Sequence, residues 1–324
     1  MSSHIRSFFL AVIAFGAAAA SDAAAQSFPS KPIQIIVPYQ PGGPTDSVAR
    51  VVGKQLSEAL GTPVIVDNRP GAGSIIGMQA CARAEADGHT LCLTVGDSLS
   101  YNPHLYKSLP YDPYHDFAPV IYIARGNSLI VASAKAPFSS YKEMVAYAKS
   151  NPGKLNWGTW GPFTTPDVYR LWLNHHAGIS IQEIPYKGAV PTMTAILNGE
   201  IHITFMSIGF ALPQIKAGKV RPIALVGDRR SPILPEVPTL SDFGADPGLG
   251  SYFGVFAPAK TPRRILEKLN AELDKTLKTE EVRSYLAKLT LDPVGGSVDQ
   301  FADFVKKDQA VAGRMFKAIG VKPQ

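Results

Sequence analysis

The feature that most constrains the fold is a repeated order of strand, glycine-rich turn and helix in the first third of the chain. Three short apolar segments rich in β-branched residues predict strands, at 33–37, 64–67 and 90–95. Longer segments between them predict helices, at 45–60 and 74–84. Strands and helices that alternate in this way form a parallel sheet covered by helices. The chain is therefore expected to fold in the α/β class.

A second series of the same kind follows two further strand candidates, at 120–124 and 129–132. It comprises strands at 155–158, 181–185 and 201–205, and helices at 141–150, 166–175 and 190–197. Two such series in 324 residues predict two lobes. We expect residues 26–123 and 227–324 to form lobe 1 and residues 124–226 to form lobe 2, with crossings near 121–125 and 223–228. Helices expected at 262–279 and within 298–318 would return to cover lobe 1.

A ligand cleft is expected between the lobes, because open α/β sheets bind ligands beyond the carboxyl ends of their strands. The loops at those ends lie at 38–46, 68–74, 96–102, 158–166 and 206–210. In the first loop, glycines turn the chain and Pro44 begins a helix, whose unpaired N–H groups attract anions. The lysine of a nucleotide-binding loop is missing, and Asp46 follows instead. The loop therefore predicts an anion site of another kind.

The N-terminal segment has the three regions of a signal peptide. Arg6 precedes an apolar run at 8–20, and three alanines precede Gln26. This run of 13 residues is shorter than the ~20 that a membrane-spanning helix needs. We expect residues 1–25 to be removed on export to the periplasm. The alternative is a buried N-terminal helix.

The two cysteines, Cys81 and Cys92, are expected to form a disulfide. Cys81 lies near the end of a predicted helix and Cys92 lies early in the strand that follows. A helix that packs back on its next strand brings such positions together. Two buried free thiols are the alternative, but an oxidising compartment favours the disulfide.

Composition and spacing exclude several other classes of protein. The net charge of +6 is spread along the chain without the basic face of a nucleic-acid-binding protein. His175 and His176 are adjacent, so on a helix they point in different directions and cannot both bind one metal ion. No histidine or cysteine pair has the spacing of a zinc site. We expect no nucleic-acid partner, no metal and no cofactor.

Two enzyme motifs are present but incomplete. Residues 96–99 read Gly-Asp-Ser-Leu, as in secreted serine esterases of the GDSL type, with Ser98 just after a predicted strand. Such an esterase needs a base and its orienting acid near the C-terminus, yet the last histidine is His202. The glycines at 71–77 have one residue too many for a dinucleotide-binding loop. An esterase remains the main alternative to a binding protein.

Several ordered motifs together resemble the Bug-type extracytoplasmic solute receptors of tripartite tricarboxylate transporters, over essentially the whole mature chain. They are Pro41-Gly42-Gly43-Pro44-Thr45-Asp46, residues 66–73 (Val-Asp-Asn-Arg-Pro-Gly-Ala-Gly), residues 84–91 (Ala-Glu-Ala-Asp-Gly-His-Thr-Leu), residues 109–112 (Leu-Pro-Tyr-Asp), residues 185–188 (Pro-Tyr-Lys-Gly) and residues 215–219 (Ile-Lys-Ala-Gly-Lys). The resemblance implies a two-lobed periplasmic-binding-protein fold of type II. It also implies a monomeric receptor without enzymatic activity, which passes a small carboxylate to membrane subunits or feeds a ligand sensor.

The resemblance also implies which loops bind the ligand. The loop at 41–46 would bind a carboxylate through backbone donors of Gly43, Thr45 and Asp46, and the loop at about 160–166 would complete the site. Pro44 stands where the family usually has a third glycine, which removes one donor. Asp46 is also interpreted as a residue that fixes its own loop and stabilises the helix dipole.

Departures from the family pattern predict the kind of cargo. Residues 160–167 read Trp-Gly-Pro-Phe-Thr-Thr-Pro-Asp, and Met206 stands where the family has an acidic residue. An apolar, flat-walled cleft would follow, which favours an aromatic or otherwise bulky carboxylic acid such as a benzene dicarboxylate. The alternative is that Trp160 and Phe163 have a structural role and pack between the loop and its lobe. The residues expected to bind ligand are Tyr39, Gly43, Thr45, Asp46, Ser98, Trp160, Phe163, Thr164, Thr165 and Met206.

Overall fold

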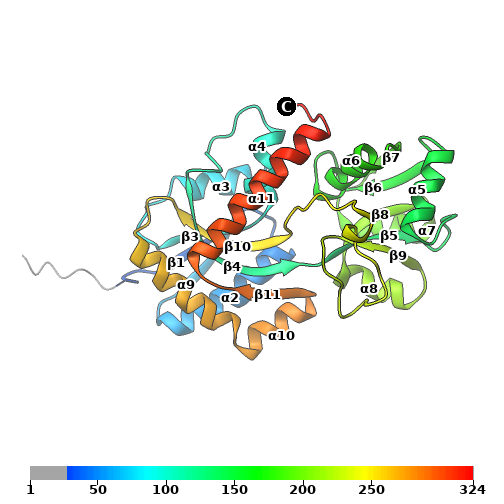
Figure 1. Ribbon diagram of the computed structural model, residues 1–324. Coiled ribbons are helices and arrows are strands. Elements are labelled where there is room, and N and C mark those ends of the chain that lie inside the picture. The colour runs from blue at the N-terminus through cyan, green and yellow to red at the C-terminus, as the bar shows by residue number, and fades with distance from the viewer. Residues whose placement is uncertain (1–27, 324) are drawn as a thin grey trace, which may run out of the picture.

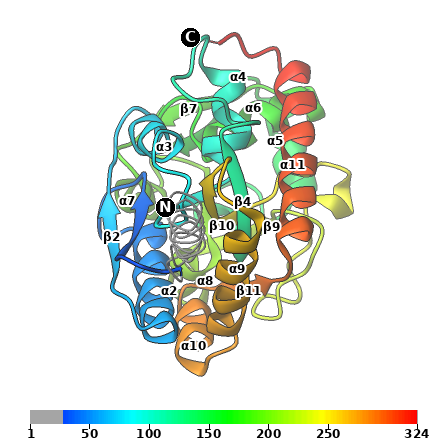
Figure 2. The ribbon, with the colours of Figure 1, turned by 90° about the vertical axis from the view of Figure 1, so that its left-hand side faces the viewer.

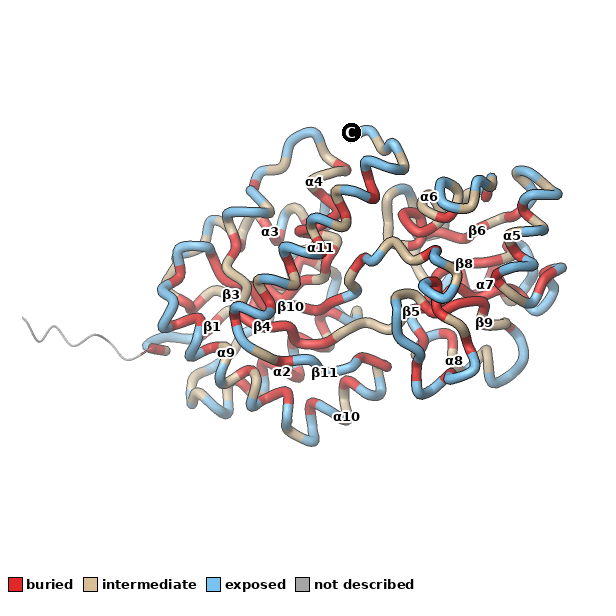
Figure 3. The backbone as a smooth tube through the Cα atoms, in the orientation of Figure 1, coloured by how far each residue is buried: buried red, intermediate tan, exposed pale blue. Residues whose placement is uncertain are grey.

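The computed structural model describes residues 28–323, so the signal peptide expected at 1–25 lies outside the described residues. The described chain forms two α/β lobes side by side, each built on its own sheet (Figure 1). Buried residues concentrate between each sheet and its helices (Figure 3). None of the helices in residues 28–323 is long and apolar enough to cross a membrane.

Lobe 1 contains a six-stranded sheet in the order β11-β4-β10-β3-β1-β2. Its strands are β1 Ile33–Val37, β2 Val64–Asn68, β3 Thr90–Val95, β4 Phe117–Gly126, β10 Tyr252–Pro258 and β11 Leu291–Gly295. β1 pairs in parallel with β2 and β3, whereas β10 and β11 pair antiparallel with their neighbours. The expected parallel βα units therefore form one part of a mixed sheet.

Helices cover both faces of the lobe 1 sheet (Figure 2). The α-helices of lobe 1 are α2 Pro44–Leu60, α3 Ile75–Ala82, α4 Asn102–Leu105, α9 Arg263–Leu277, α10 Glu280–Lys288 and α11 Val298–Ala318. One core cluster joins α2, α9 and α10 to the sheet, and another joins α3 and α11 to its other face. The C-terminal helices thus return to lobe 1.

Lobe 2 contains a five-stranded sheet in the order β7-β6-β8-β5-β9. Its strands are β5 Ser128–Ser133, β6 Leu155–Thr159, β7 Ile181–Pro185, β8 Ile203–Ser207 and β9 Val220–Leu225. Its helices are α5 Tyr141–Ser150, α6 Thr165–Ala177, α7 Ala189–Asn198 and α8 Ile208–Lys216. α5 and α6 pack in one core cluster, and α7 and α8 pack in another on the opposite face.

The two connections between the lobes run side by side. β4 leads over Asn127 into β5, and the chain returns along residues 226–251. Gly126 donates its N–H to the Ser251 carbonyl (2.8 Å), and Val226 donates to the Ser128 carbonyl (2.9 Å). The lobe boundaries drawn from the sequence stay a prediction. Within residues 227–249, which that prediction gives to lobe 1, Leu234, Val237 and Leu240 pack in the core clusters of lobe 2.

Local sequence explains where the helix beside the cleft begins and ends. α2 starts after Gly43 with Pro44 in its first turn, where the missing N–H costs nothing. It ends at Gly61, whose φ of 62° is in the left-handed region that glycine adopts without strain. The first signal sets where the helix begins after strand β1, and the second sets where it ends.

Cys81 on α3 and Cys92 on β3 form a disulfide, with their Cα atoms 6.2 Å apart. Both side chains are buried in the cluster between α3, α11 and the sheet. The bridge fastens α3 to the strand that follows it, as the packing of a helix on its next strand suggests. It lies in the core and contributes no side chain to the cleft described below.

Candidate functional site

A cavity of about 590 Å³ lies between the lobes, at the carboxyl ends of β1 and β3. Lobe 1 contributes most of its lining, including Tyr39, Asp97 and Tyr106, and lobe 2 contributes residues 162–164. Its walls combine aromatic rings and prolines with polar residues and glycines. This cavity is the candidate site, because both lobes contribute to it and it lies where an open α/β sheet binds ligands.

In lobe 1, Asp46 holds the loop that precedes α2. Its Oδ2 accepts hydrogen bonds from the Gly42 amide (2.9 Å) and from Nε of Arg50 (3.0 Å). Burial would raise the pKa of Asp46, but the hydrogen bonds from Arg50 and Gly42 lower it below its usual value. The carboxylate is thus ionised and turned toward its own loop.

Lobe 2 repeats this arrangement before α6. Asp167 accepts a hydrogen bond from the Phe163 amide (2.8 Å) and from Nε of Arg170 (2.8 Å). Thr164 donates its hydroxyl to the Gly161 carbonyl (2.7 Å). Phe163 has a φ of 60°, and it lines the cavity together with Thr164. An aspartate–arginine pair therefore fixes the loop at the start of a helix in each lobe.

The first turns of these two helices supply backbone donors. The first intrahelical hydrogen bond of α2 runs from the Ser47 amide to Gly43 (2.9 Å), and that of α6 runs from the Val168 amide to Thr164 (2.9 Å). Amides that precede these bonds have no acceptor within their own helix. Each helix thus directs positive potential toward its N-terminal loop, which favours an anion.

A polar network extends from the lobe 1 wall of the cavity into the lobe. The Tyr39 hydroxyl donates to Oδ1 of Asp97 (2.8 Å) and lies 3.0 Å from the Ser98 hydroxyl. Ser98 in turn donates to the Ser74 hydroxyl (2.8 Å) and lies 2.7 Å from Oγ1 of Thr94. Burial raises the pKa of Asp97, and burial together with the charge of Asp97 raises the pKa of Tyr39 well above its usual value.

Ser98 is not an esterase nucleophile in this arrangement. Its side chain is fully buried, and its hydroxyl has hydroxyl partners instead of the imidazole that would activate it. The same burial keeps Ser98 out of contact with a ligand, so its expected direct role in binding is corrected to support of Tyr39.

The expectation that Met206 contacts the ligand is also corrected. Met206 is fully buried in the core cluster formed with α7 and α8, where it packs with residues such as Leu129 and Val131. The neighbouring Phe205 belongs to the cluster on the opposite face of the sheet. Side chains alternate along a strand, so the position at the end of β8 turns Met206 into the core and away from the cavity.

The remaining predicted residues lie around the cavity without lining it. Gly43, Thr45, Asp46, Trp160 and Thr165 all belong to the two loops or to the first helical turns, but none of them is part of the lining. Thr45 and Asp46 are buried, whereas Trp160 and Thr165 are partly exposed. Of the predicted set, Tyr39, Phe163 and Thr164 reach the cavity.

Sequence reasoning missed part of the lining. Asp97, Asn102 and Tyr106 come from the segment after β3, and Gly73 lies at the loop after β2. A Cβ atom on Gly73 would lie 2.7 Å from the Tyr106 hydroxyl, so only glycine lets that ring approach. The expected loop at 96–102 includes Asp97 and Asn102, and an extension by four residues would have included Tyr106.

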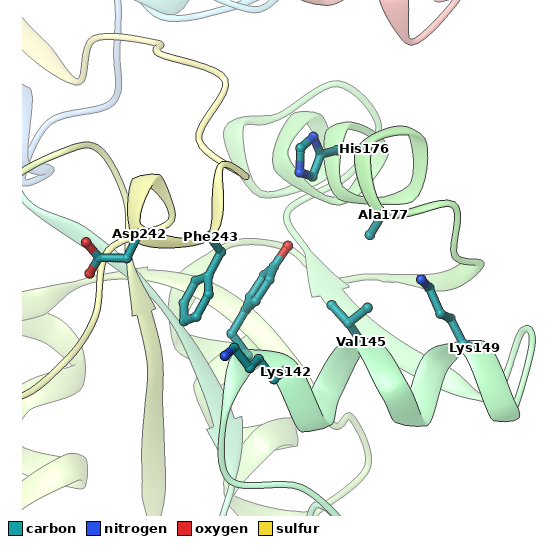
Figure 4. A pocket seen from close by; sticks show the side chains of 8 residues that line it. Lys142, Val145, Lys149, His176, Ala177, Asp242 and Phe243 are labelled. Atoms are coloured by element: carbon teal, nitrogen blue, oxygen red, sulfur yellow. The ribbon is translucent and has the colours of Figure 1, made fainter.

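A second cavity, of about 510 Å³, lies on the surface of lobe 2 (Figure 4). The ring of Phe243 stacks on Tyr141 with the ring centroids 4.4 Å apart, and Lys142 and Lys149 lie along the same helix, α5. Its lining comes from α5, from the end of α6 and from Asp242 and Phe243 of the return connection, so it is not enclosed by the two sheets' loops as the interlobe site is. Among residues 28–323, no group of three or more potential metal ligands is present.

Comparisons with known proteins agree with this geometry. A family model described as "Tripartite tricarboxylate transporter family receptor" matches residues 48–321. Protein BugT of Bordetella pertussis is 33% identical over 301 residues, which cover 91% of this chain and 92% of that protein. The structure of the periplasmic binding protein BugD has a TM-score of 0.77 at 29% identity and covers 92% of this chain and 100% of its own.

A further solved structure, of an R. palustris protein with adipate, has a TM-score of 0.79 at 30% identity. It covers 92% of this chain and 100% of its own. The likeness extends over both lobes in each case. The expected two-lobed fold of a periplasmic binding protein is therefore confirmed.

Proposed function

Because this chain belongs to the tripartite tricarboxylate transporter receptor family, and to its Bug type, we propose that it captures a carboxylate between its lobes for delivery to the membrane subunits of such a transporter. It is a solute-binding receptor and not an enzyme. Periplasmic binding proteins are among its solved relatives, which supports a periplasmic location. Release of residues 1–25 on export and a monomeric state belong to the same proposal.

The observation that carries the proposal is the cavity between the lobes, with a helix-starting loop in each wall. Tyr39 and Gln40 of the lobe 1 wall precede α2, and Phe163 and Thr164 of the lobe 2 wall precede α6. Positive potential at two helix N-termini favours an anionic group between them. A carboxylate is the anion supported by the relative that was solved with adipate.

Aromatic side chains support a bulky or aromatic body for this carboxylic acid. Tyr39, Tyr106 and Phe163 line the cavity from both lobes, with Leu105 and prolines between them. Flat rings bury the faces of an aromatic ligand. Each well-placed ring pair contributes roughly 0.5–1.5 kcal/mol of binding free energy beyond that of the buried apolar area. Short aliphatic acids would leave part of this apolar surface without contact.

Calorimetry with the purified receptor tests the proposal, with benzoate-type acids and C4 to C6 aliphatic diacids as ligands. We expect saturable binding of aromatic acids, weakened about tenfold by Phe163→Ala because the lobe 2 wall loses its ring. Tyr114→Ala is the matched control, since this exposed ring lies outside the cavity. Equal affinities of the aromatic and aliphatic acids, unchanged in the Phe163 variant, would contradict the aromatic cargo.

A further inference from the structure

Among residues 28–323, Asp97 is the one charged side chain in the lining of the interlobe cavity. Among the described residues, no lysine, arginine or histidine lines this cavity. The basic residues of the two helix-starting loops, Arg50 and Arg170, are paired with Asp46 and Asp167. Two helix N-termini therefore lie beside the site and favour one anion, and the wall carries a negative charge at another point.

The Asp97 carboxylate is held in place by one of its two oxygens. Oδ1 accepts hydrogen bonds from the Tyr39 hydroxyl (2.8 Å) and from the Ser98 amide (3.1 Å). Both of these hydrogen bonds from the described residues go to the same oxygen. Tyr39 is itself fixed through Ser98, which is buried between Thr94 and Ser74. The network orients the carboxylate and leaves one oxygen as an acceptor.

This arrangement discriminates between kinds of carboxylic acid. A second carboxylate of the ligand beside Asp97 would place two negative charges together in a partly desolvated site, which is unfavourable unless a proton is shared. An ammonium group at the same place would donate a charge-assisted hydrogen bond to the acceptor oxygen. The raised pKa of Asp97, caused by its burial, indicates that the protein itself does not fully compensate this charge.

We propose that Asp97 binds a cationic nitrogen of the cargo, so that the receptor takes an amino-substituted carboxylic acid in preference to a dicarboxylic acid. This inference rests on the proposed function, since the carboxylate of the cargo binds at the helix N-termini. Asp97 selects the group at the other end of the ligand, and Tyr39 is the residue that positions it.

Calorimetry at pH 7.5 with two matched pairs of ligands tests the inference. The pairs are 6-aminohexanoate with adipate, and 4-(aminomethyl)benzoate with terephthalate; in each pair an ammonium group replaces one carboxylate. We expect the wild-type protein to bind the amino member of at least one pair about tenfold more tightly than the diacid. Asp97→Asn should remove most of that preference by weakening the amino member alone. Asp303→Asn is the matched control, because Asp303 is exposed on α11 and lies outside the cavity.

Three other outcomes are informative, because each would contradict either the role of Asp97 or the binding of a carboxylate. Diacids that bind the wild-type protein as tightly as their amino partners would overturn the role of Asp97. A preference that persists in Asp97→Asn would overturn it too. Failure of all four acids to bind would instead contradict the proposed carboxylate function. The preference of the wild-type protein is measured without any variant, so the inference is tested even if Asp97→Asn does not fold.

Discussion

At the residue scale, the two lobes use the same pair of side chains to build their ligand-facing loops. Asp46 and Asp167 each accept a hydrogen bond from an amide four residues earlier, and each is paired with an arginine on the next turn. The pairs fix the loop backbone and leave the remaining first-turn amides as donors. An acidic residue at the start of each helix is thus compatible with binding an anion, because its charge is already neutralised by the protein.

Replacement of either aspartate should destabilise its lobe. We expect Asp46→Ala and Asp167→Ala each to lower the free energy of unfolding by about 1–3 kcal/mol, because a loop amide and an arginine lose their acceptor. Urea unfolding of the purified variants measures this change, and Asp303→Ala is an exposed control. A loss no larger than that of the control would show that the pairs do not hold the loops.

At the site, sequence position could predict only those lining residues that lie on a loop before the start of a helix. Tyr39, Phe163 and Thr164 lie on loops directly before a helix start, and they line the cavity as sequence position suggests. Met206 lies at a strand end, where a shift of one residue exchanges the two faces of the sheet. The role proposed for Asp97 could not be predicted from the sequence. It depends on which residues line the cavity, and the fold brings these together from distant segments.

At the element scale, the parallel βα units were predictable, as were the antiparallel strands β4 and β5, whereas the antiparallel strands β9, β10 and β11 were not assigned from the sequence. The helices and strands from 33 to 95 follow from hydrophobic period and turn residues, and they differ from the structure by one or two residues. β10 is a fully buried strand between β3 and β4, and sequence analysis did not assign it. Its apolar run contains a glycine and ends in proline, and its partners lie far away in the sequence. Local pattern cannot reveal such a pairing.

The disulfide is an element-scale link between α3 and β3. Eleven residues separate Cys81 from Cys92, so the bridge restricts a short loop of the unfolded chain. Loops near this length stabilise a fold by roughly 2–3 kcal/mol in the chain-entropy model. We expect a reductant to lower the midpoint of urea unfolding accordingly. Intact-mass analysis after alkylation provides the control: two reactive thiols before reduction would contradict the bridge.

At the scale of the whole molecule, the return connection is held against lobe 1 by a buried carboxylate. Asp308 on α11 accepts hydrogen bonds from the Gly250 amide (2.6 Å) and from the Ser100 hydroxyl (2.5 Å). A Cβ atom at residue 250 would lie 2.5 Å from the ring of Phe304. The connection can therefore approach α11 this closely only because residue 250 is a glycine. Sequence spacing could predict that the chain crosses twice, whereas the path of residues 226–251 depends on such contacts between distant segments.

This carboxylate should make stability depend on pH. Burial raises the pKa of Asp308 from 3.8 to about 6 in the folded protein. Between these pH values the folded state binds more protons than the unfolded state, so the free energy of unfolding should fall as the pH rises from 4 to 6. The rise of about two pKa units sets an upper limit of about 3 kcal/mol.

Asp308→Asn should remove this contribution, because an amide can accept from Gly250 and donate to Ser100 without titrating. The variant should therefore gain stability relative to wild type as the pH is raised from 4 to 7.5. Urea unfolding of both proteins across this range measures the difference, and Asp303→Asn controls for the loss of a negative charge. Parallel stability curves for Asp308→Asn and wild type would show that Asp308 titrates at its ordinary pKa and that its burial imposes no cost on the connection between the lobes.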